Sequence, residues 1–198
     1  MKTKGAKIAE IVAWSLAGVV LVGALGYYNF VDKAPVSGVK PGNRCPDFSA
    51  QTYAVDGDKF YLDGNTFTLS QQIGKVCVVN FWETWCPGCI KELPEFDHLQ
   101  RTYGEQIEVI AIAGVTSTPE FALDWMNEKG WEAHNDKYDW KDYELTIAWL
   151  PTEKCQELGC TQSLPRTVIV DKSGIVSYES SGVTMTYEMV ETEVLKLL

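Results

Sequence analysis

The stretch VCVVNFWETWCPGCI, residues 76–90, decides the fold of this chain. Its first part, Val76–Trp82, is a short continuous apolar run, which is typical of a β-strand buried on both faces. A helical pattern follows over about Pro87–Tyr103. Two cysteines, Cys86 and Cys89, therefore lie at C-x-x-C spacing where the buried strand ends and the helix begins.

The segments around this strand and helix predict a single domain from Cys45 onward. Residues 131–153 mix aromatic and acidic side chains without a clear period. The order of elements predicts an α/β fold, in which a central mixed β-sheet is flanked by helices. The further elements expected are a hairpin over Phe60–Leu69 around Asp63-Gly64, a strand over Glu108–Val115, a helix from Thr118-Pro119 to about Lys129, a hairpin of Thr167–Asp171 with Ile175–Tyr178, and a terminal helix with Val190, Val194 and Leu197 on one apolar face.

The composition of the chain excludes two classes of protein. Hydrophobic residues make up 45% of the 198 residues and aromatic residues 12%, which is enough apolar surface for a folded core and excludes a disordered chain. The formal charge is −10, so the chain lacks the basic surface that nucleic-acid binding needs. We therefore expect no nucleic acid among its partners.

The first 30 residues have the pattern of an N-terminal transmembrane helix. Lys2, Lys4 and Lys7 precede an uncharged apolar run over residues 11–30. Twenty helical residues span about 30 Å, the thickness of the hydrocarbon core of a bilayer. Lysines ahead of the run favour a cytoplasmic N-terminus, so we expect a single-pass protein of the cell membrane with its soluble domain on the extracytoplasmic side.

A cleaved signal peptide is the alternative for this segment. Residues 24–26 loosely fit a cleavage site, although the apolar run is longer than that of a usual signal peptide. The expected boundaries are 1–30 for the anchor or uncleaved signal, 31–43 for an extended tether rich in proline and glycine, and 44–198 for the soluble domain. Both alternatives place that domain outside the cytoplasm, where disulfides persist.

The C-x-x-C pair is the reactive feature of the sequence. Unpaired amide groups and the dipole at a helix N-terminus stabilise a thiolate. This favours Cys86 as the exposed nucleophile and Cys89 as the shielded thiol that resolves a mixed disulfide. A zinc site would need two more ligands, and Cys155 with Cys160 fits that spacing poorly. A c-type haem attachment needs histidine where the chain has Ile90, which leaves an inert structural disulfide as the remaining alternative.

Three motifs give the chain a resemblance to a known family. NFWETWCPGC at 80–89 is followed by KELP at 91–94, the soluble domain opens with CPDF at 45–48, and SLPRTVIVD occupies 163–171. In this order and spacing they resemble the membrane-anchored TlpA/ResA-like thiol–disulfide oxidoreductases. The resemblance extends from about residue 42 to residue 198 and implies a thioredoxin-like fold. We expect no metal and no cofactor.

The resemblance implies roles for individual residues. Glu92, on the same helical face as Cys89, matches the acid that takes up the proton of Cys89. Pro94 matches a proline that kinks the helix, and Pro165 matches a cis-proline that faces the disulfide. Without the resemblance, Glu92 would be interpreted as a solvated side chain and Pro165 as an ordinary trans proline. The residues expected to bind substrate are Trp85, Pro87, Gly88, Leu164 and Pro165.

The chain departs from the family at several positions. The dipeptide Pro87-Gly88 between the cysteines is unusual, so the redox potential of the family does not carry over. Glu83 stands where alanine or glycine is usual, and a negative charge there is expected to oppose a nearby thiolate. Arg166 follows Pro165, and if directed into the substrate groove it would attract an acidic substrate. The alternative for each of these departures is that the side chain faces solvent and has no effect on the reactive pair.

Four cysteines lie outside the reactive pair. If Gly159 ends a helix in the left-handed conformation, Cys155 and Cys160 hold the two positions that touch in such a cap. The sequence leaves two alternatives for this pair, a structural disulfide or two free thiols. Cys77 is expected to pack as a small buried group in its strand. Cys45 would pair with Cys77 only if the N-terminal segment crosses that strand.

The sequence therefore predicts an extracytoplasmic, membrane-tethered thiol–disulfide oxidoreductase. Like the reducing branch of the family that it resembles, it is expected to take electrons from a membrane thiol donor and to reduce protein disulfides, such as those of apocytochrome c. A disulfide-forming oxidase of the same fold is the first alternative, because the sequence does not set the direction of electron flow. A copper or other metal carrier is the second, although the C-x-x-x-C spacing common in such carriers is not present.

Overall fold

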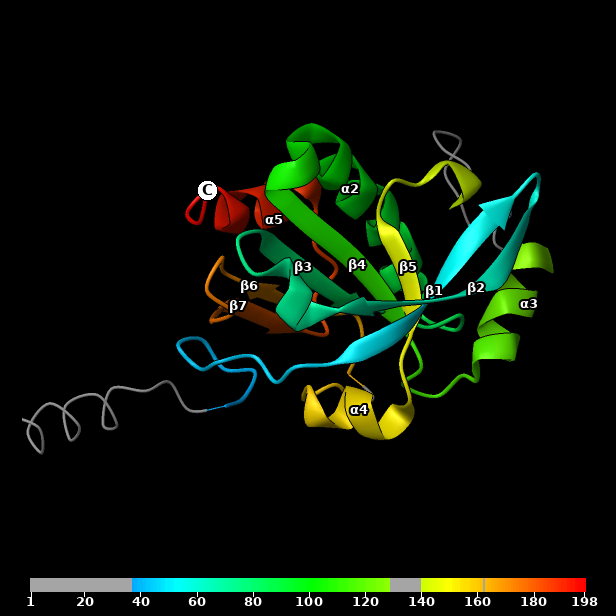
Figure 1. The fold of residues 1–198 in the computed structure, drawn as a ribbon, viewed down its shortest axis with the longest axis horizontal. Helices are drawn as coiled ribbons and strands as arrows, with labels where there is room; N and C mark the ends of the chain where they lie inside the picture. The colour runs from blue at the N-terminus through cyan, green and yellow to red at the C-terminus, as the bar shows by residue number, and fades with distance from the viewer. Residues whose placement is uncertain (1–36, 129–139, 162) are drawn as a thin grey trace, which may run out of the picture. The chain divides into compact units, whose positions relative to one another are not determined.

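The computed structural model describes residues 37–128, 140–161 and 163–198. Ser37–Leu198 is one compact unit of the chain. Its described residues form one seven-stranded β-sheet with the strand order β2-β1-β5-β4-β3-β6-β7 (Figure 1). The strands are β1 (Ser49–Asp56), β2 (Lys59–Thr68), β3 (Val76–Phe81), β4 (Ile107–Ala113), β5 (Thr146–Trp149), β6 (Arg166–Val170) and β7 (Val176–Ser181).

Strand β3 carries the reactive pair to one edge of the sheet. All of its residues are buried, as expected of a continuous apolar run. β4 runs parallel to β3 on one side and β6 runs antiparallel on the other, which confirms the mixed sheet. The carboxyl ends of β3 and β4 and the amino end of β6 therefore meet at one edge, called the carboxyl edge below. The chain enters α2 from this edge.

Helices cover both faces of the sheet (Figure 1). Phe96 and Leu99 of α2 share a core with Val109 of β4, and α3 and α5 contribute side chains to the same core. α4 and η1 belong to a second core on the opposite face, which includes Phe81 and Ile112. The helices are η1 (Leu69–Gln72), α2 (Pro87–Tyr103), η2 (Gly104–Gln106), α3 (Pro119–Glu128), η4 (Trp140–Asp142), α4 (Thr152–Glu157) and α5 (Tyr187–Val194).

The longer elements match the sequence predictions. α2 has the predicted bounds and contains Pro94. α3 begins at Pro119, and the Oγ1 atom of Thr118 accepts the N–H of Phe121 at 3.2 Å. β6 and β7 form the predicted antiparallel hairpin, and α5 buries Val190 and Val194. These predictions are confirmed.

The hairpin predicted around Asp63-Gly64 is wrong. These two residues lie inside β2, and the chain turns at Gly57 between β1 and β2 instead. Asp63 accepts a hydrogen bond from Thr52 of β1 at 2.7 Å, beside a shift in the β1–β2 register. The Asp-Gly pair therefore marks an irregularity in the ladder and not a turn. The sequence pattern also missed β1 and β5, and for α4 it indicated only a helix end at Gly159, without bounds.

The predicted anchor, residues 1–30, lies outside the described residues. No helix in the part of the chain that the structure describes is long and apolar enough to cross a membrane. The last part of the predicted tether, from Ser37 on, belongs to the folded unit. There the N–H of Gly42 donates to the carbonyl of Val176 at 2.8 Å, which attaches this segment to β7.

Candidate active site

Cys86 and Cys89 form a disulfide at the carboxyl edge. Cys86 is the N-cap residue of α2, and its Sγ atom accepts the backbone N–H of Cys89 at 3.2 Å. The N–H of Cys86 donates to the carbonyl of Glu83 at 3.0 Å, which closes the turn between strand and helix. Cys86 is 5% exposed and Cys89 is fully buried, so Cys86 is the more accessible of the two. At a helix N-terminus it is also the cysteine whose thiolate is stabilised on reduction.

Glu92 is a buried acid on the same helix. Its Oε1 atom accepts a hydrogen bond from Nδ2 of Asn80 at 2.6 Å, and its Oε2 atom accepts the backbone N–H of Met185 at 2.9 Å. Burial raises the pKa of Glu92 from its ordinary value of 4.5 to about 7, although the two hydrogen bonds oppose the rise. A carboxyl group with such a pKa takes up and releases a proton near neutral pH. The alternative of a solvated Glu92 is therefore wrong.

Asn80 connects Glu92 to the sheet. It lies on β3, is fully buried, and its Nδ2 atom is also 3.3 Å from Oγ1 of Thr167 on β6. Its Oδ1 atom is buried without a hydrogen-bond partner among the described residues. Rotation of the amide by half a turn would present this oxygen to Glu92. Asn80 is therefore able to donate to a carboxylate or to accept from a carboxylic acid at the same place.

The loop before β6 forms the other side of the site. The peptide bond between Leu164 and Pro165 is cis, as the resemblance implied. A Cβ atom on Gly88 would lie 3.6 Å from Cδ of Pro165 and 2.7 Å from Oγ1 of Thr184, so this loop passes close to the dipeptide between the cysteines. The residues expected to bind substrate are placed at this edge as follows: Trp85 and Pro87 are exposed, and Gly88 and Leu164 are half-buried beside Pro165.

Neither Glu83 nor Arg166 is solvent-facing. Arg166 is 7% exposed, its Nη1 atom lies 3.2 Å from Oε2 of Glu179, and its guanidinium packs against Gly159 at the end of α4. The two alternatives considered for Arg166, a side chain in the substrate groove and a solvent-facing one, both differ from this buried ion pair with Glu179. Glu83 is fully buried, and its carboxylate faces the loop that follows β4.

Cys155 and Cys160 flank the predicted helix cap. Gly159 has a φ of +69°, and the N–H of Cys160 donates to the carbonyl of Cys155 at 2.8 Å, as in a Schellman motif. Both cysteines are nevertheless free thiols, so the second disulfide considered from the sequence is not formed. The Cys155 thiol lies 3.5 Å from the carbonyl oxygen of Leu150, to which it donates. Burial is the main cause that raises the pKa of each thiol to about 12, which keeps both protonated.

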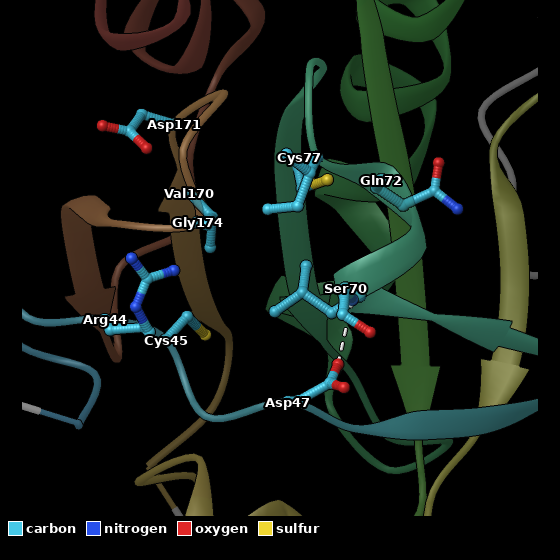
Figure 2. A pocket seen from close by; sticks show the side chains of 11 residues that line it. Arg44, Cys45, Asp47, Ser70, Gln72, Cys77, Val170, Asp171 and Gly174 are labelled. Carbon is cyan, nitrogen blue, oxygen red and sulfur yellow. Dashed lines mark hydrogen bonds between the residues drawn. The ribbon is translucent and has the colours of Figure 1, made fainter.

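Cys45 and Cys77 lie at the opposite edge of the sheet. Figure 2 shows them on two sides of a small cavity of about 110 Å³, Cys45 from the N-terminal segment and Cys77 from β3. The N–H of Cys45 donates to the carbonyl of Gly174 at 3.0 Å, which holds the N-terminal segment there. Both cysteines are free thiols, and burial raises the pKa of Cys45 to about 11 and that of Cys77 to about 12. This cavity is separate from the Cys86–Cys89 disulfide.

Several groups that hold the site together were missed by sequence reasoning. The Oγ1 atom of Thr116 accepts the indole N–H of Trp85 at 2.9 Å. Thr116 directly follows the predicted strand Glu108–Val115, and residues at the carboxyl ends of adjacent parallel strands are a signal that would have found it. The sequence holds no signal for the backbone N–H of Met185 that donates to Glu92, because every residue except proline carries such a group.

The arrangement supports thiol–disulfide exchange. It combines a cysteine at a helix N-terminus, a buried second cysteine and a buried carboxyl group with a raised pKa on one helix. Within residues 37–128, 140–161 and 163–198 there is no group of three or more His, Cys, Asp or Glu side chains that could hold a metal ion.

Comparison with known proteins identifies the family. A family model described as Redoxin matches residues 40–194, most of the chain. The chain belongs to the Redoxin family. The thioredoxin-like protein YneN of Bacillus subtilis is 31% identical to this Redoxin-family chain over 182 residues, which cover 89% of this chain and 94% of YneN. The thiol-disulfide oxidoreductase ResA of Geobacillus kaustophilus is 29% identical over 179 residues, which cover 87% of each chain.

Solved structures confirm the thioredoxin-like fold of this Redoxin-family protein. The exposed lipoprotein thioredoxin Etrx1 of Streptococcus pneumoniae superposes with a TM-score of 0.59 at 22% identity, over 77% of this chain and all of Etrx1. A thiol:disulfide interchange protein of Chlorobium tepidum gives a TM-score of 0.59 at 21% identity, over 80% of this chain and 97% of that protein. With the family, its ResA relatives and the Cys86–Cys89 disulfide, the Redoxin-family chain is a thiol–disulfide oxidoreductase, as predicted.

Proposed function

We propose that this protein is a membrane-tethered, extracytoplasmic enzyme that reduces protein disulfides through Cys86 and Cys89. The observation that carries the proposal is the buried Glu92, whose pKa is raised to about 7, on the same helix as the shielded Cys89. A shielded thiol must lose its proton before it attacks a mixed disulfide. Glu92, three residues further along α2, supplies a proton acceptor inside the protein.

The first step of the proposed reaction starts from the reduced protein. The Cys86 thiolate attacks one sulfur atom of a client disulfide, so that a bond forms between Cys86 and the client while the client disulfide breaks. The second client sulfur leaves as a thiolate. The N-terminus of α2 stabilises the attacking thiolate. Residues that would hold the client beside Cys86 are Trp85, Pro87, Gly88, Leu164 and Pro165.

The second step releases the client. Cys89 transfers its proton to the Glu92 carboxylate and attacks the sulfur atom of Cys86, which breaks the mixed disulfide and frees the remaining client sulfur as a thiolate. Two electrons have then passed from the two protein thiols to the client. The protein is left with the Cys86–Cys89 disulfide, the state present in the structure. A membrane thiol donor would return it to the reduced state.

The location and the clients belong to the same proposal. The lysines and the apolar run at residues 2–30 support a single-pass anchor with the enzyme on the extracytoplasmic side of the cell membrane. The TlpA/ResA-like resemblance supports protein disulfides as substrates, with apocytochrome c in cytochrome c maturation as the first candidate client.

The reduction potential of the Cys86–Cys89 pair tests the direction of electron flow. The full chain is equilibrated in buffers of oxidised and reduced dithiothreitol, and the fraction of disulfide is read by alkylation and mass spectrometry. A potential near about −270 mV, the value of thioredoxin, is expected of a reductase. A potential near about −120 mV, the value of the oxidant DsbA, would contradict the proposal and favour a disulfide-forming oxidase.

A further inference from the structure

Glu83 is a buried carboxylate that the proposed reaction does not use. It follows β3 and is fully buried. Its Oε1 atom accepts four hydrogen bonds, from the backbone N–H groups of Gly114 (3.3 Å), Thr116 (2.8 Å) and Ser117 (3.2 Å) and from the hydroxyl group of Ser117 (3.2 Å). Successive backbone N–H groups that converge on one point form a binding site for a negatively charged oxygen. Glu83 therefore anchors the loop of residues 114–117.

This loop lies at the carboxyl edge. It links β4 to α3, and β4 is the parallel neighbour of β3. On the other side of β3, the antiparallel β6 brings Pro165 to the same edge. The loop of residues 114–117 and the loop that contains the cis-proline therefore flank the Cys86–Cys89 disulfide on opposite sides.

The loop in turn holds an exposed aromatic side chain next to the nucleophile. Trp85 directly precedes Cys86 and is 54% exposed. Its indole N–H donates to Oγ1 of Thr116 at 2.9 Å. Thr116 thus connects the exposed Trp85 ring to a loop whose backbone N–H groups donate to Glu83.

The rest of the loop is held by the last residue of β5 and the first residue of α4. The indole N–H of Trp149 donates to the carbonyl of Ser117 at 2.8 Å, and the hydroxyl group of Thr152 donates to the carbonyl of Gly114 at 2.9 Å. These bonds engage carbonyl groups, whereas Glu83 engages the N–H groups of the same loop. Without Glu83, the buried N–H groups would lose their acceptor, and burial of unpaired donors is unfavourable.

We propose that Glu83 is a positioning residue for client binding: its carboxylate orders residues 114–117, and Thr116 of this loop orients the Trp85 ring as one wall of the client groove. The inference rests on the proposed function and adds a residue that determines client affinity. It predicts a specific signature. Loss of Glu83 should weaken binding of a peptide that needs the groove and spare the reaction with a small disulfide that needs only Cys86.

The test measures single turnovers of the full chain reduced at Cys86 and Cys89. One substrate is a disulfide-bonded peptide, and the other is the small aromatic disulfide 5,5′-dithiobis(2-nitrobenzoate). For Glu83→Gln, whose amide oxygen still accepts but carries no charge, we expect the half-saturating peptide concentration to rise about threefold to tenfold, because hydrogen bonds to a charged acceptor are stronger than those to a neutral one by about 1 kcal/mol. The maximal rate with the peptide should stay within about twofold of wild type, and the rate with the small disulfide should not fall, because loss of a negative charge near the pair does not disfavour the Cys86 thiolate.

Thr116→Val removes only the acceptor of the Trp85 indole. Thr116 is exposed, so this variant is expected to fold even if Glu83→Gln does not. It should raise the half-saturating concentration by the same factor. In the double variant the two effects should not add, because both act through the orientation of Trp85.

Asp97→Asn is the matched control. Asp97 is also a fully buried carboxylate that accepts the N–H groups of another segment, those of Glu144 (2.6 Å) and Leu145 (3.2 Å), next to the amino end of β5 and away from the carboxyl edge. It should lower the stability of the protein without a change in the half-saturating peptide concentration.

Three results would overturn the inference. They are an unchanged half-saturating concentration in Thr116→Val, an additive effect in the double variant, and an equal loss with the small disulfide in Glu83→Gln, which would place the effect on Cys86 itself. Wild-type protein that reduces neither substrate would instead contradict the proposed function. The two failures are therefore distinguishable.

Discussion

Replacement of Glu92 by glutamine is expected to change how the stability of the protein depends on pH. Burial raises the pKa of Glu92 from 4.5, the value expected in the unfolded chain, to about 7 in the folded protein. The folded state therefore binds this proton more tightly than the unfolded state. The stability that results is fully present below pH 4.5 and is lost as the pH rises through about 7.

The magnitude follows from the size of the shift. A rise from 4.5 to about 7 corresponds to about 3 kcal/mol at about 1.36 kcal/mol per pKa unit, of which about 2.5 kcal/mol is lost between about pH 5 and about pH 8. Glutamine stays neutral and shows no such loss. Its oxygen can accept the N–H of Met185, and its NH₂ group can donate to the unpartnered Oδ1 atom of Asn80 once that amide rotates.

Urea unfolding of the oxidised full chain at about pH 5 and about pH 8 measures the effect. The free energy of unfolding of Glu92→Gln minus that of wild type should be larger at about pH 8 than at about pH 5 by about 2.5 kcal/mol, because only wild type loses stability as the pH rises. Glu95→Gln, at a half-buried position on the same helix, is the control for removal of a carboxyl group from α2. An equal difference for Glu92→Gln at both pH values would refute the reasoning.

Two further predictions concern a glycine and the buried thiols. Gly114→Ala should destabilise the protein by about 3 kcal/mol or more in urea unfolding, because Gly114 has a φ of +126° and a Cβ atom there would overlap the carbonyl oxygen of Leu150; a loss below about 1 kcal/mol would contradict this packing. In the native reduced protein at about pH 8, iodoacetamide should modify Cys86 and leave Cys155 and Cys160 unmodified, since their pKa of about 12 leaves only about one thiol in 10⁴ ionised. Peptide mass spectrometry after timed quenching checks this, and equal rates at Cys86 and Cys160 would count against it.

The part of the fold that the sequence predicts is the part with long, regular patterns. β3 is a continuous apolar run and α2 has a clear helical pattern, so both were found with bounds close to those observed. β5 has only four residues and α4 has six, too few for a period to be visible. The Asp63-Gly64 pair misled because the same residues that favour a turn also favour an irregular position within a strand.

The candidate site divides in a similar way. The spacing of Cys86 and Cys89 at a strand–helix junction identifies the reactive pair without a structure. The burial of Glu92 does not follow from its own neighbours, because its partners are Asn80, 12 residues away, and the backbone of Met185, 93 residues away. The contacts of Glu83 likewise arise only when β4 pairs with β3.

The most direct test of the central claim is a mixed disulfide trapped on Cys89→Ser. In the proposed reaction Cys86 attacks the client and Cys89 releases it, so the reduced variant should accumulate a one-to-one mixed disulfide with a disulfide-bonded peptide. Mass spectrometry of the digested complex should find the peptide on Cys86. Formation of the same complex by Cys86→Ser, or attachment of the peptide to Cys45, Cys77, Cys155 or Cys160 in Cys89→Ser, would contradict the account.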